Sequence, residues 1–312
     1  MTQRRETEGE RIASMLASAT EIVAALGLED QLVAISHECD YPPGVLDRPR
    51  ASRPIFEVDA LSSGEIDRAV RTALLEHGSV YAVAGELLAR VNPTLILTQA
   101  VCDVCAVPTA GVREVVAERH LNAHVLSLDA HTLSDILETV HAVGRAAGVP
   151  ARATALVAAL TARIERVRDA VEDRPRPRVL AIEWLDPVFL PGHWVPEMIE
   201  IAGGQNLAGA VGRRSVESSF NELEGLDPDV LLIMPCGYGL EASLREADAF
   251  RDSLLRIAAR AVSDGNAWAV DGSSFFNRSG PRVVDGIEIV SAILHGAGKE
   301  GLNGRASKWE SH

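Results

Sequence analysis

Residues 226–235 read LDPDVLLIMP, and residues 91–99 read VNPTLILTQ. Each stretch places a proline just before a short, continuous run of apolar residues. A run of this length that follows turn-forming residues predicts a strand buried on both faces, as in a parallel sheet. Because the same pattern stands once in each half of the chain, it predicts two similar α/β lobes.

Further strands repeat in the same order around these two. HVLSLD (124–129) follows the first stretch as NAWAVDG (266–272) follows the second. Short apolar strands are also predicted at residues 11–15 and 178–184, before the two stretches. Alternation of such strands with helical patterns predicts a parallel sheet covered on both faces in each half.

Helix signals stand between the predicted strands. After the first strand comes SATE, in which Ser18 is the expected N-cap and Glu21 stands three residues later. Gly27 is expected to end this helix. Residues 195–202 predict the corresponding helix of the second half.

A helical segment separates the two halves. Residues 132–173 have helical periodicity, with a break at Gly148 and Pro150. The apolar positions after the break share the spacing of one buried helix face, and they are Leu156, Leu160, Ile164, Val167 and Val171. Periodicity alone fits an ordinary surface helix equally well, but the position between the repeats favours a stiff connection. The predicted parts are an N-terminal lobe (11–130), a helical connector (131–175), a C-terminal lobe (176–298) and two tails (1–10 and 299–312).

Length and charge exclude several classes of protein. The 312 residues exceed one ordinary core and fit two domains of about 150 residues each. A net charge of −14 argues against nucleic-acid binding, which needs clustered Lys and Arg. No apolar run is long enough to span a membrane. The N-terminus shows no signal-peptide pattern, which predicts a cytoplasmic protein unless a leader has been removed.

Polar and aromatic residues gather directly after the predicted strands, where open parallel sheets bind ligands. The segments are HECDYPP (37–43), AVCDVCAV (100–107), EWLDPVFLPGHW (183–194), PCGYGLE (235–241) and SSFFNRSGPR (273–282). In a chain that is only 4% aromatic, this clustering predicts a flat, largely apolar ligand held by ring faces. The alternative is that each aromatic ring packs against its own sheet.

In this order, the segments resemble the cobalamin-binding proteins of ABC importers. The matching elements are SATEIVAALGL (18–28), CDYPP (39–43), the helical connector, a helix ending in AGG (202–204) and FFNRSGPR (275–282). The resemblance implies two Rossmann-like α/β lobes with parallel sheets, joined by a long helical backbone. It also implies a corrinoid such as cobalamin, or a related metal chelate, in a cleft between the lobes. The expected function is ligand binding rather than catalysis, in transport or as a cytosolic carrier.

The resemblance also implies which loops face the ligand. These loops are His37–Tyr41, Trp184–Trp194 and Phe275–Arg278. Together with the aromatic strand ends, they give the candidate ligand-binding residues His37, Asp40, Tyr41, Glu183, Trp184, Phe189, His193, Trp194, Tyr238, Phe276 and Arg278. An imidazole can bind a corrin cobalt from below, which singles out His193, although a plain loop hydrogen bond is the alternative.

The same family implies a permease as partner. In its members an acidic residue on each lobe docks arginines of the permease, and Glu114 and Glu241 stand in roughly suitable places. Because no export signal is evident, a corrinoid carrier that never meets a transporter is a further interpretation.

Four cysteines give the alternative function. Cys102 and Cys105 have a Cys-x-x-Cys spacing, which lets two thiolates reach one ion and is also that of a redox pair. Cys39 and Cys236 follow other predicted strands, one in each lobe. Four converging thiolates would suit zinc or an iron–sulfur cluster in a cytosolic enzyme or sensor. Packing as small apolar residues is the alternative.

Overall fold

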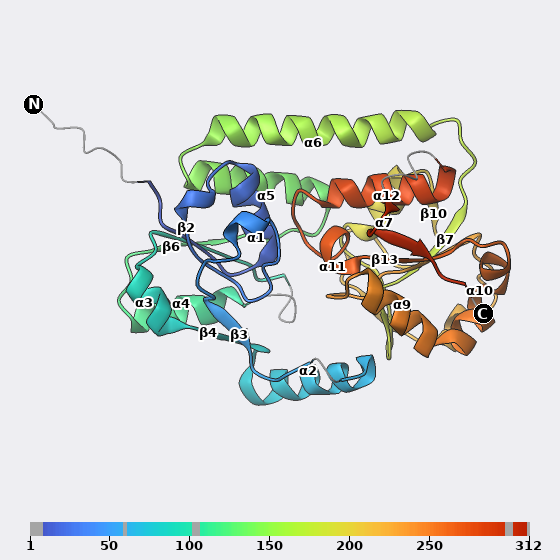
Figure 1. The fold of residues 1–312 in the computed structure, drawn as a ribbon, viewed down its shortest axis with the longest axis horizontal. Helices are drawn as coiled ribbons and strands as arrows, with labels where there is room; N and C mark the ends of the chain where they lie inside the picture. The colour runs from blue at the N-terminus through green and yellow to red at the C-terminus, as the bar shows by residue number, and fades with distance from the viewer. Residues whose placement is uncertain (1–8, 59–60, 102–106, 297–301, 311–312) are drawn as a thin grey trace, which may run out of the picture. The chain divides into compact units, whose positions relative to one another are not determined.

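The computed structural model describes residues 9–58, 61–101, 107–296 and 302–310 (Figure 1). The chain divides into two compact units. Unit 1 comprises Met1–Ala60, Arg68–Asp129 and Glu138–Val157, and unit 2 comprises Leu61–Asp67, Ala130–Leu137 and Ala158–His312. Within the described ranges, no helix has both the length and the apolar character needed to cross a membrane.

The elements of unit 1 are short strands alternating with helices. In chain order they are β1 (Ile12–Ser14), α1 (Ala17–Ala25), η1 (Glu29–Gln31), β2 (Leu32–Ile35), η2 (Pro43–Val45), β3 (Ser52–Pro54), β4 (Tyr81–Val83), α3 (Gly85–Val91), β5 (Leu95–Thr98), α4 (Thr109–Glu118) and β6 (His124–Ser127). Three helices have residues in both units, and they are α2 (Ser63–His77), α5 (Leu133–Ala146) and α6 (Pro150–Val171).

Unit 2 has the same kind of alternation. Its elements are β7 (Arg178–Ile182), β8 (Trp184–Leu185), β9 (Val188–Leu190), α7 (Val195–Ile201), β10 (Gln205–Asn206), β11 (Val216–Ser218), α8 (Phe220–Leu223), β12 (Val230–Ile233), α9 (Leu240–Ala249), α10 (Arg251–Ser263), β13 (Ala267–Val270), α11 (Gly272–Phe275), α12 (Val283–His295) and β14 (Ala306–Lys308).

The sheet of unit 1 is parallel, with the strand order β2-β1-β5-β6. Successive residues of its strands point to opposite faces. Ile12 and Leu95 belong to the apolar cluster that also holds residues of α1 and α5. Ala13 and Ile96 belong to a second cluster, with residues of α3 and α4. The sheet is therefore covered on both faces, as the continuous apolar runs predicted.

The sheet of unit 2 repeats this order as β10-β7-β12-β13 and adds β14 at one edge. The predicted pairs of corresponding strands are β1 with β7, β5 with β12, and β6 with β13. Within each unit these three strands lie side by side in the same order, all parallel. The predicted fold class, two α/β units with parallel sheets, is confirmed.

The two proline-containing stretches also share a backbone detail. Asn92 precedes Pro93 with φ 44°, and Asp227 precedes Pro228 with φ 43°. Among non-glycine residues, Asn and Asp tolerate this left-handed conformation best, because their short polar side chains can form local hydrogen bonds that offset the crowding of Cβ against the following carbonyl. Both units thus enter their central strand through the same strained turn.

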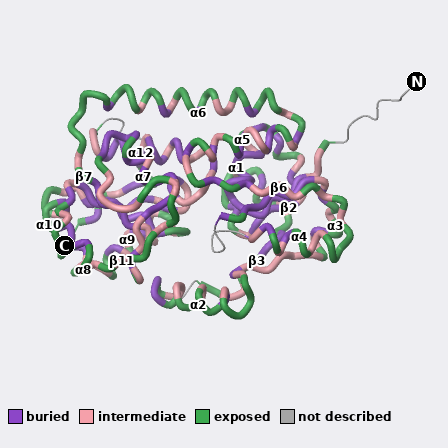
Figure 2. Tube along the Cα trace, turned by 180° about the vertical axis from the view of Figure 1, so that it is seen from behind, coloured by how far each residue is buried: buried purple, intermediate pink, exposed green. Residues whose placement is uncertain are grey.

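The long helices follow the predicted pattern, with α5 ending before the break and α6 beginning at Pro150. Along α6, Leu160, Ile164 and Val171 are buried on one face. Figure 2 shows α6 exposed along most of its length, whereas the strands β5 and β12 are buried throughout. The i, i+4 spacing therefore identified the packed face of this helix.

Two local expectations were wrong. The N-cap of α1 is Leu16, in extended conformation, so Ser18 lies inside the first turn and does not cap the helix. The turn between β1 and α1 is shorter than expected, and the Ser14 hydroxyl donates to the Leu16 carbonyl inside it (2.9 Å). Residues 299–312 were expected to be a tail, but β14 pairs antiparallel with β13 and Trp309 is buried.

Replacing Asn92 tests the shared turn. Asn92→Ala is expected to lower the free energy of unfolding by about 1 kcal/mol, because a Cβ without a polar side chain is disfavoured at positive φ. Asn92→Gly should cost little or nothing. Urea unfolding followed by circular dichroism checks this, and equal losses in both variants would contradict it.

Candidate ligand-binding site

The strand ends of unit 2 form an aromatic edge. Trp184 follows β7 and Tyr238 follows β12, and these two strands are paired in the sheet. The two rings lie edge to face with centroids 5.3 Å apart. The Trp184 indole N–H donates to the Asp186 carbonyl (3.1 Å), and the Cys236 N–H donates to the Glu183 carbonyl (2.9 Å). Because both rings are only partly buried, they offer a fixed apolar surface.

Glu183 comes directly after β7, and its carboxyl is buried against the Ser215 side chain. Burial raises the pKa of Glu183 to about 7, although a hydrogen bond with the Ser215 side chain acts to lower it. Near neutral pH the Glu183 side chain is therefore a mixture of its protonated and ionised forms. The protonated form can donate a hydrogen bond, and both forms can accept one.

A second carboxyl near this edge, Glu246 of α9, is also weakly acidic. Burial raises the pKa of Glu246, a hydrogen bond with the Ser63 side chain lowers it, and the charge of Asp186 raises it. Burial, and then the charge of Glu246, raise the pKa of Tyr238. Burial therefore disfavours the charged form of Glu246 and of Tyr238 at this edge.

His193 is held on a strained backbone between β9 and α7. Its φ is 51°, and its backbone is fixed by two hydrogen bonds, from its N–H to the Arg213 carbonyl (2.6 Å) and from the Gly212 N–H to its carbonyl (2.8 Å). A Cβ added to Gly192 would lie 2.3 Å from the Arg213 carbonyl oxygen, so only glycine fits there. The loop is thus built to hold His193 in one place.

The ring of His193 contacts two other rings, with centroids 5.5 Å from His131 and 5.6 Å from Trp194. Burial lowers the pKa of His193, and the positive charges of His131 and Arg214 lower it further. The imidazole is therefore neutral near pH 7. His131, which sequence reasoning did not select, belongs to this cluster.

Some of the other predicted residues of unit 2 are packed inside it. Phe276 is fully buried and Trp194 is nearly so, and the Trp194 indole N–H donates to the Phe276 carbonyl (2.7 Å). In this structure the two rings pack the interior and offer little surface to a ligand. Phe189 on β9 is half-buried, and the Arg278 guanidinium donates to the Ser273 hydroxyl (3.3 Å).

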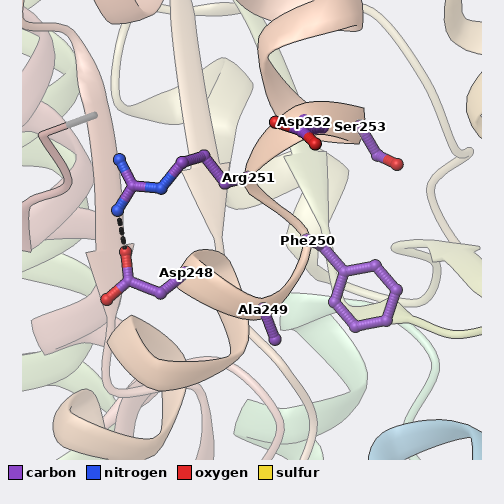
Figure 3. Close-up of a pocket in the computed structure, with 6 residues that line it drawn as sticks. All are labelled: Asp248, Ala249, Phe250, Arg251, Asp252 and Ser253. Carbon is purple, nitrogen blue, oxygen red and sulfur yellow. Dashed lines mark hydrogen bonds and ion pairs between the residues drawn. The ribbon is translucent and has the colours of Figure 1, made fainter. Parts of the chain in front are cut away.

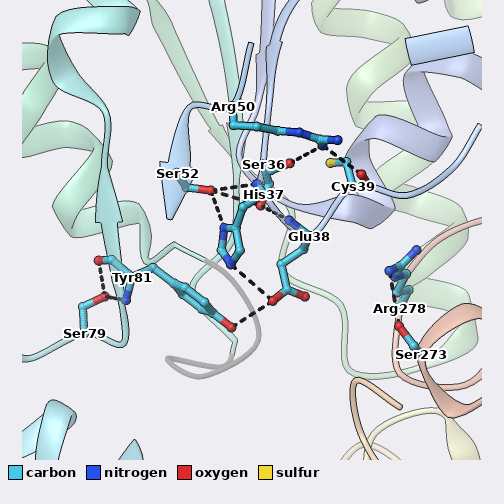
Figure 4. A network of polar contacts seen from close by, with 10 residues as sticks. All are labelled: Ser36, His37, Glu38, Cys39, Arg50, Ser52, Ser79, Tyr81, Ser273 and Arg278. Carbon is cyan, nitrogen blue, oxygen red and sulfur yellow. Dashed lines mark hydrogen bonds and ion pairs between the residues drawn. The ribbon is translucent and has the colours of Figure 1, made fainter. Parts of the chain in front are cut away.

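In unit 1, His37 lies at the centre of a polar network (Figure 4). Its Nδ1 is hydrogen-bonded to the Ser52 hydroxyl (2.8 Å), and its Nε2 lies 3.4 Å from a carboxylate oxygen of Glu38. The same carboxylate accepts a hydrogen bond from the Tyr81 hydroxyl (3.4 Å), and the rings of Tyr81 and His37 are 4.9 Å apart. Tyr81, on β4, was missed because its segment carries no other aromatic residue.

The turn that follows His37 is held by one side chain. The Arg50 guanidinium donates to the carbonyls of Ser36 (2.9 Å) and Cys39 (2.8 Å). Beyond this turn, Asp40 is exposed and Tyr41 is 45% exposed. The loop that follows β2 thus carries both a polar group in a fixed network, His37, and an accessible ring, Tyr41.

The cysteines are only partly described. Cys102 and Cys105 lie outside the described residues. Cys39 is buried in the core of unit 1 with its Sγ 3.1 Å from the Thr20 hydroxyl, whereas Cys236 is exposed. No group of three or more His, Cys, Asp or Glu residues in the described part of the chain could hold a metal ion. The position of Cys39 is that of a packing residue.

Three other features lie apart from these clusters. Glu114 on α4 and Glu241 on α9, the residues expected to contact a permease, are both exposed. A shallow hollow at the junction of α9 and α10 is lined by residues 248–253 alone (Figure 3). It contains none of the candidate ligand-binding residues.

A protein-family model matches most of the length of this chain and identifies its family. The model of the family described as periplasmic binding protein matches residues 12–256. The chain belongs to this family. It is therefore a ligand-binding protein of the substrate-binding class, which agrees with its two α/β units.

Named relatives match almost the whole chain. The vitamin B12-binding protein of Vibrio cholerae is 23% identical over 294 residues, which cover 93% of this chain and 91% of that protein. The cobalamin-binding protein of Halobacterium salinarum is 26% identical over 295 residues, which cover 93% of this chain and 70% of that protein. A periplasmic heme binding protein from Pseudomonas aeruginosa shares the fold, with a TM-score of 0.69, 20% identity and coverage of 93% and 94%.

The raised pKa of Glu183 predicts a pH-dependent effect of Glu183→Gln. Folding favours the protonated carboxyl, so its stabilising effect is present below pH 4.5 and is lost as pH rises through about 7. Glutamine stays neutral, so the variant should melt at a higher temperature than the wild type at pH 8, by roughly 2 °C or more. Near pH 4.5 the difference should vanish.

Calorimetric melting at several pH values checks this, with the exposed Glu118→Gln as control. A difference between variant and wild type that does not change with pH would contradict the assignment.

Proposed function

We propose that this chain binds a corrinoid of the cobalamin type at the aromatic edge of unit 2. The observation that carries the proposal is the pair formed by Trp184 and Tyr238. Two partly exposed rings on paired strand ends suit the face of a flat macrocycle.

Two relatives support a corrinoid over other flat chelates. The proteins of Vibrio cholerae and Halobacterium salinarum carry vitamin B12 and cobalamin in their names, and each match covers 93% of this chain. The heme binding protein with the same fold makes heme the competing ligand. Both ligands are large metal chelates built on a flat macrocycle.

The charge state of the edge favours the corrinoid. A cobalamin carries neutral amide side chains around its ring, whereas heme carries two carboxylates. The pKa of Glu246, whose charge acts on Tyr238, is raised by burial, so its carboxyl can exchange hydrogen bonds with amides at this edge. The pKa of about 7 limits the negative charge of the buried Glu183 near neutral pH. Two ligand carboxylates beside these groups would be repelled at higher pH.

We further propose that Glu114 and Glu241 dock a permease of the ABC type. Each is exposed on a helix, α4 in unit 1 and α9 in unit 2, and each lies on a different element from the aromatic edge. Exposed carboxylates can pair with arginines without first losing a partner inside the chain. A cytoplasmic corrinoid carrier is the alternative role for the same binding site.

Replacing Trp184 tests the binding site. Isothermal titration calorimetry with cyanocobalamin should give saturable binding to the wild type, and Trp184→Ala should weaken it about tenfold or more, as loss of a central aromatic contact does. Leu75→Ala, which removes an exposed apolar side chain elsewhere, should bind as the wild type does. A folded wild type that gives no binding heat, or that binds hemin more tightly than cyanocobalamin, would overturn the corrinoid assignment.

Charge reversal tests the docking residues. The double variant Glu114→Arg, Glu241→Arg should lose uptake of radiolabelled cobalamin in cells that contain the permease, because two attractive pairs become repulsive. Its affinity for cyanocobalamin in solution should be unchanged. Normal uptake by the double variant would exclude these two residues as the docking contacts, and Glu118→Arg serves as control.

A further inference from the structure

Three segments of unit 2 that are distant in sequence pack together around His193. A Cβ on Gly192 would lie 2.3 Å from the Arg213 carbonyl oxygen and 2.6 Å from the Arg214 carbonyl carbon. A Cβ on Gly212 would lie 3.6 Å from the Thr132 side chain. The backbone next to His193 thus lies against that of Arg214, and the same loop reaches the residue after His131.

The imidazole of His193 lacks a partner in this cluster. Its Nδ1 is buried and has no hydrogen bond within the described residues. Leaving a buried polar atom unpaired is costly, so such atoms mark places where another group completes the site. The nearest ring with a titratable nitrogen is that of His131, at 5.5 Å between centroids.

Positive charge gathers beside this ring. Arg214 is exposed, and among the described residues no ion pair or side-chain hydrogen bond engages its guanidinium. After burial, the charges of His131 and Arg214 are the causes that lower the pKa of His193. The positive charges that disfavour a proton on His193 also attract an anion to the same place.

The nearby carboxylates are bound to the start of α5. Asp135 accepts hydrogen bonds from the N–H groups of His131 (3.0 Å) and Thr132 (2.9 Å), and Glu197 accepts one from Leu133 (3.1 Å). Burial raises the pKa of Asp135, but its hydrogen bonds with His131 and Thr132 lower the pKa overall, and the charge of His131 makes the smallest contribution. These carboxylates therefore cap the helix and leave Arg214 without a counterion.

We propose that His131, His193 and Arg214 form a subsite for an oxyanion carried by the bound ligand. An oxyanion seated there accepts a hydrogen bond from the tautomer of His193 that carries its proton on Nδ1, and it supplies the counterion that the guanidinium lacks. The proposal rests on the proposed function and extends it, since it selects ligands that carry an anionic arm. In a cobalamin that arm is the phosphodiester of the nucleotide, and in heme it is a propionate.

Ligands with and without the anionic arm provide the test. Calorimetry compares cyanocobalamin with dicyanocobinamide, which lacks the nucleotide, and hemin with its dimethyl ester. Arg214→Gln should weaken the binding of cyanocobalamin about fivefold or more, as expected for a partly exposed charge pair. It should leave the binding of dicyanocobinamide unchanged. The matched control is Arg213→Gln, the neighbouring exposed arginine, which should change neither.

The comparison of hemin with its dimethyl ester identifies the kind of oxyanion that the subsite binds. A loss for hemin but not for its dimethyl ester would assign the subsite to a carboxylate instead of a phosphodiester. Equal losses for cyanocobalamin and dicyanocobinamide in Arg214→Gln, or equal effects of Arg213→Gln and Arg214→Gln, would overturn the subsite.

A second readout does not depend on a corrinoid. Proton NMR titration of the imidazole signals, with that of His193 assigned from His193→Gln, should show its pKa rising when inorganic phosphate is added, because a bound anion favours the protonated ring. No shift with phosphate in the folded wild type would overturn the subsite. If neither corrinoid nor hemin binds but phosphate shifts this pKa, the proposed function fails and the anion subsite stands.

Discussion

The direction of the parallel strands is the constraint on which the candidate site depends. Parallel strands all end at the same edge of a sheet, so the residues after them emerge together. β7 and β12 are paired in register up to Ile182 and Ile233. This pairing brings Glu183 and Trp184 next to the turn that carries Tyr238, although the two segments are far apart in the sequence. In unit 1, β2 is parallel to β1, so the loop after β2 that holds His37 likewise emerges at the edge where the parallel strands end.

Much of the fold was predictable because its signals are local. A turn residue, a proline and a continuous apolar run identify β5 and β12, and their repetition in order identifies the duplicated sheet. The N-cap of α1 was not predictable, because the side chain of Ser18 is compatible with a cap and only the shape of the preceding turn excludes it. The strand β14 is three residues long, too short for its composition to distinguish it from a tail.

The site was predictable by residue type and only partly by position. Trp184 and Tyr238 lie at the expected edge, but Phe276 and Trp194 turn inward, since a cluster of aromatic residues does not reveal which rings pack the core. His131 and Tyr81 were missed because each meets its histidine partner only through tertiary packing. Cys39 shows the same limit, because a thiol after a strand is as suited to a core as to a metal.

Burial gives the aromatic edge its chemical character. The chain as a whole is strongly acidic, but burial raises the pKa of Glu183 and Glu246 and lowers the pKa of His193, so the charged form is disfavoured at each. A surface of this kind suits a macrocycle whose edge consists mostly of neutral amides. Any anionic group on such a ligand still needs a counterion that does not titrate. A guanidinium meets that requirement, because it keeps its charge where an imidazole loses it. The exposed Arg214, whose charge acts on His193, therefore gives unit 2 a positive charge that does not titrate.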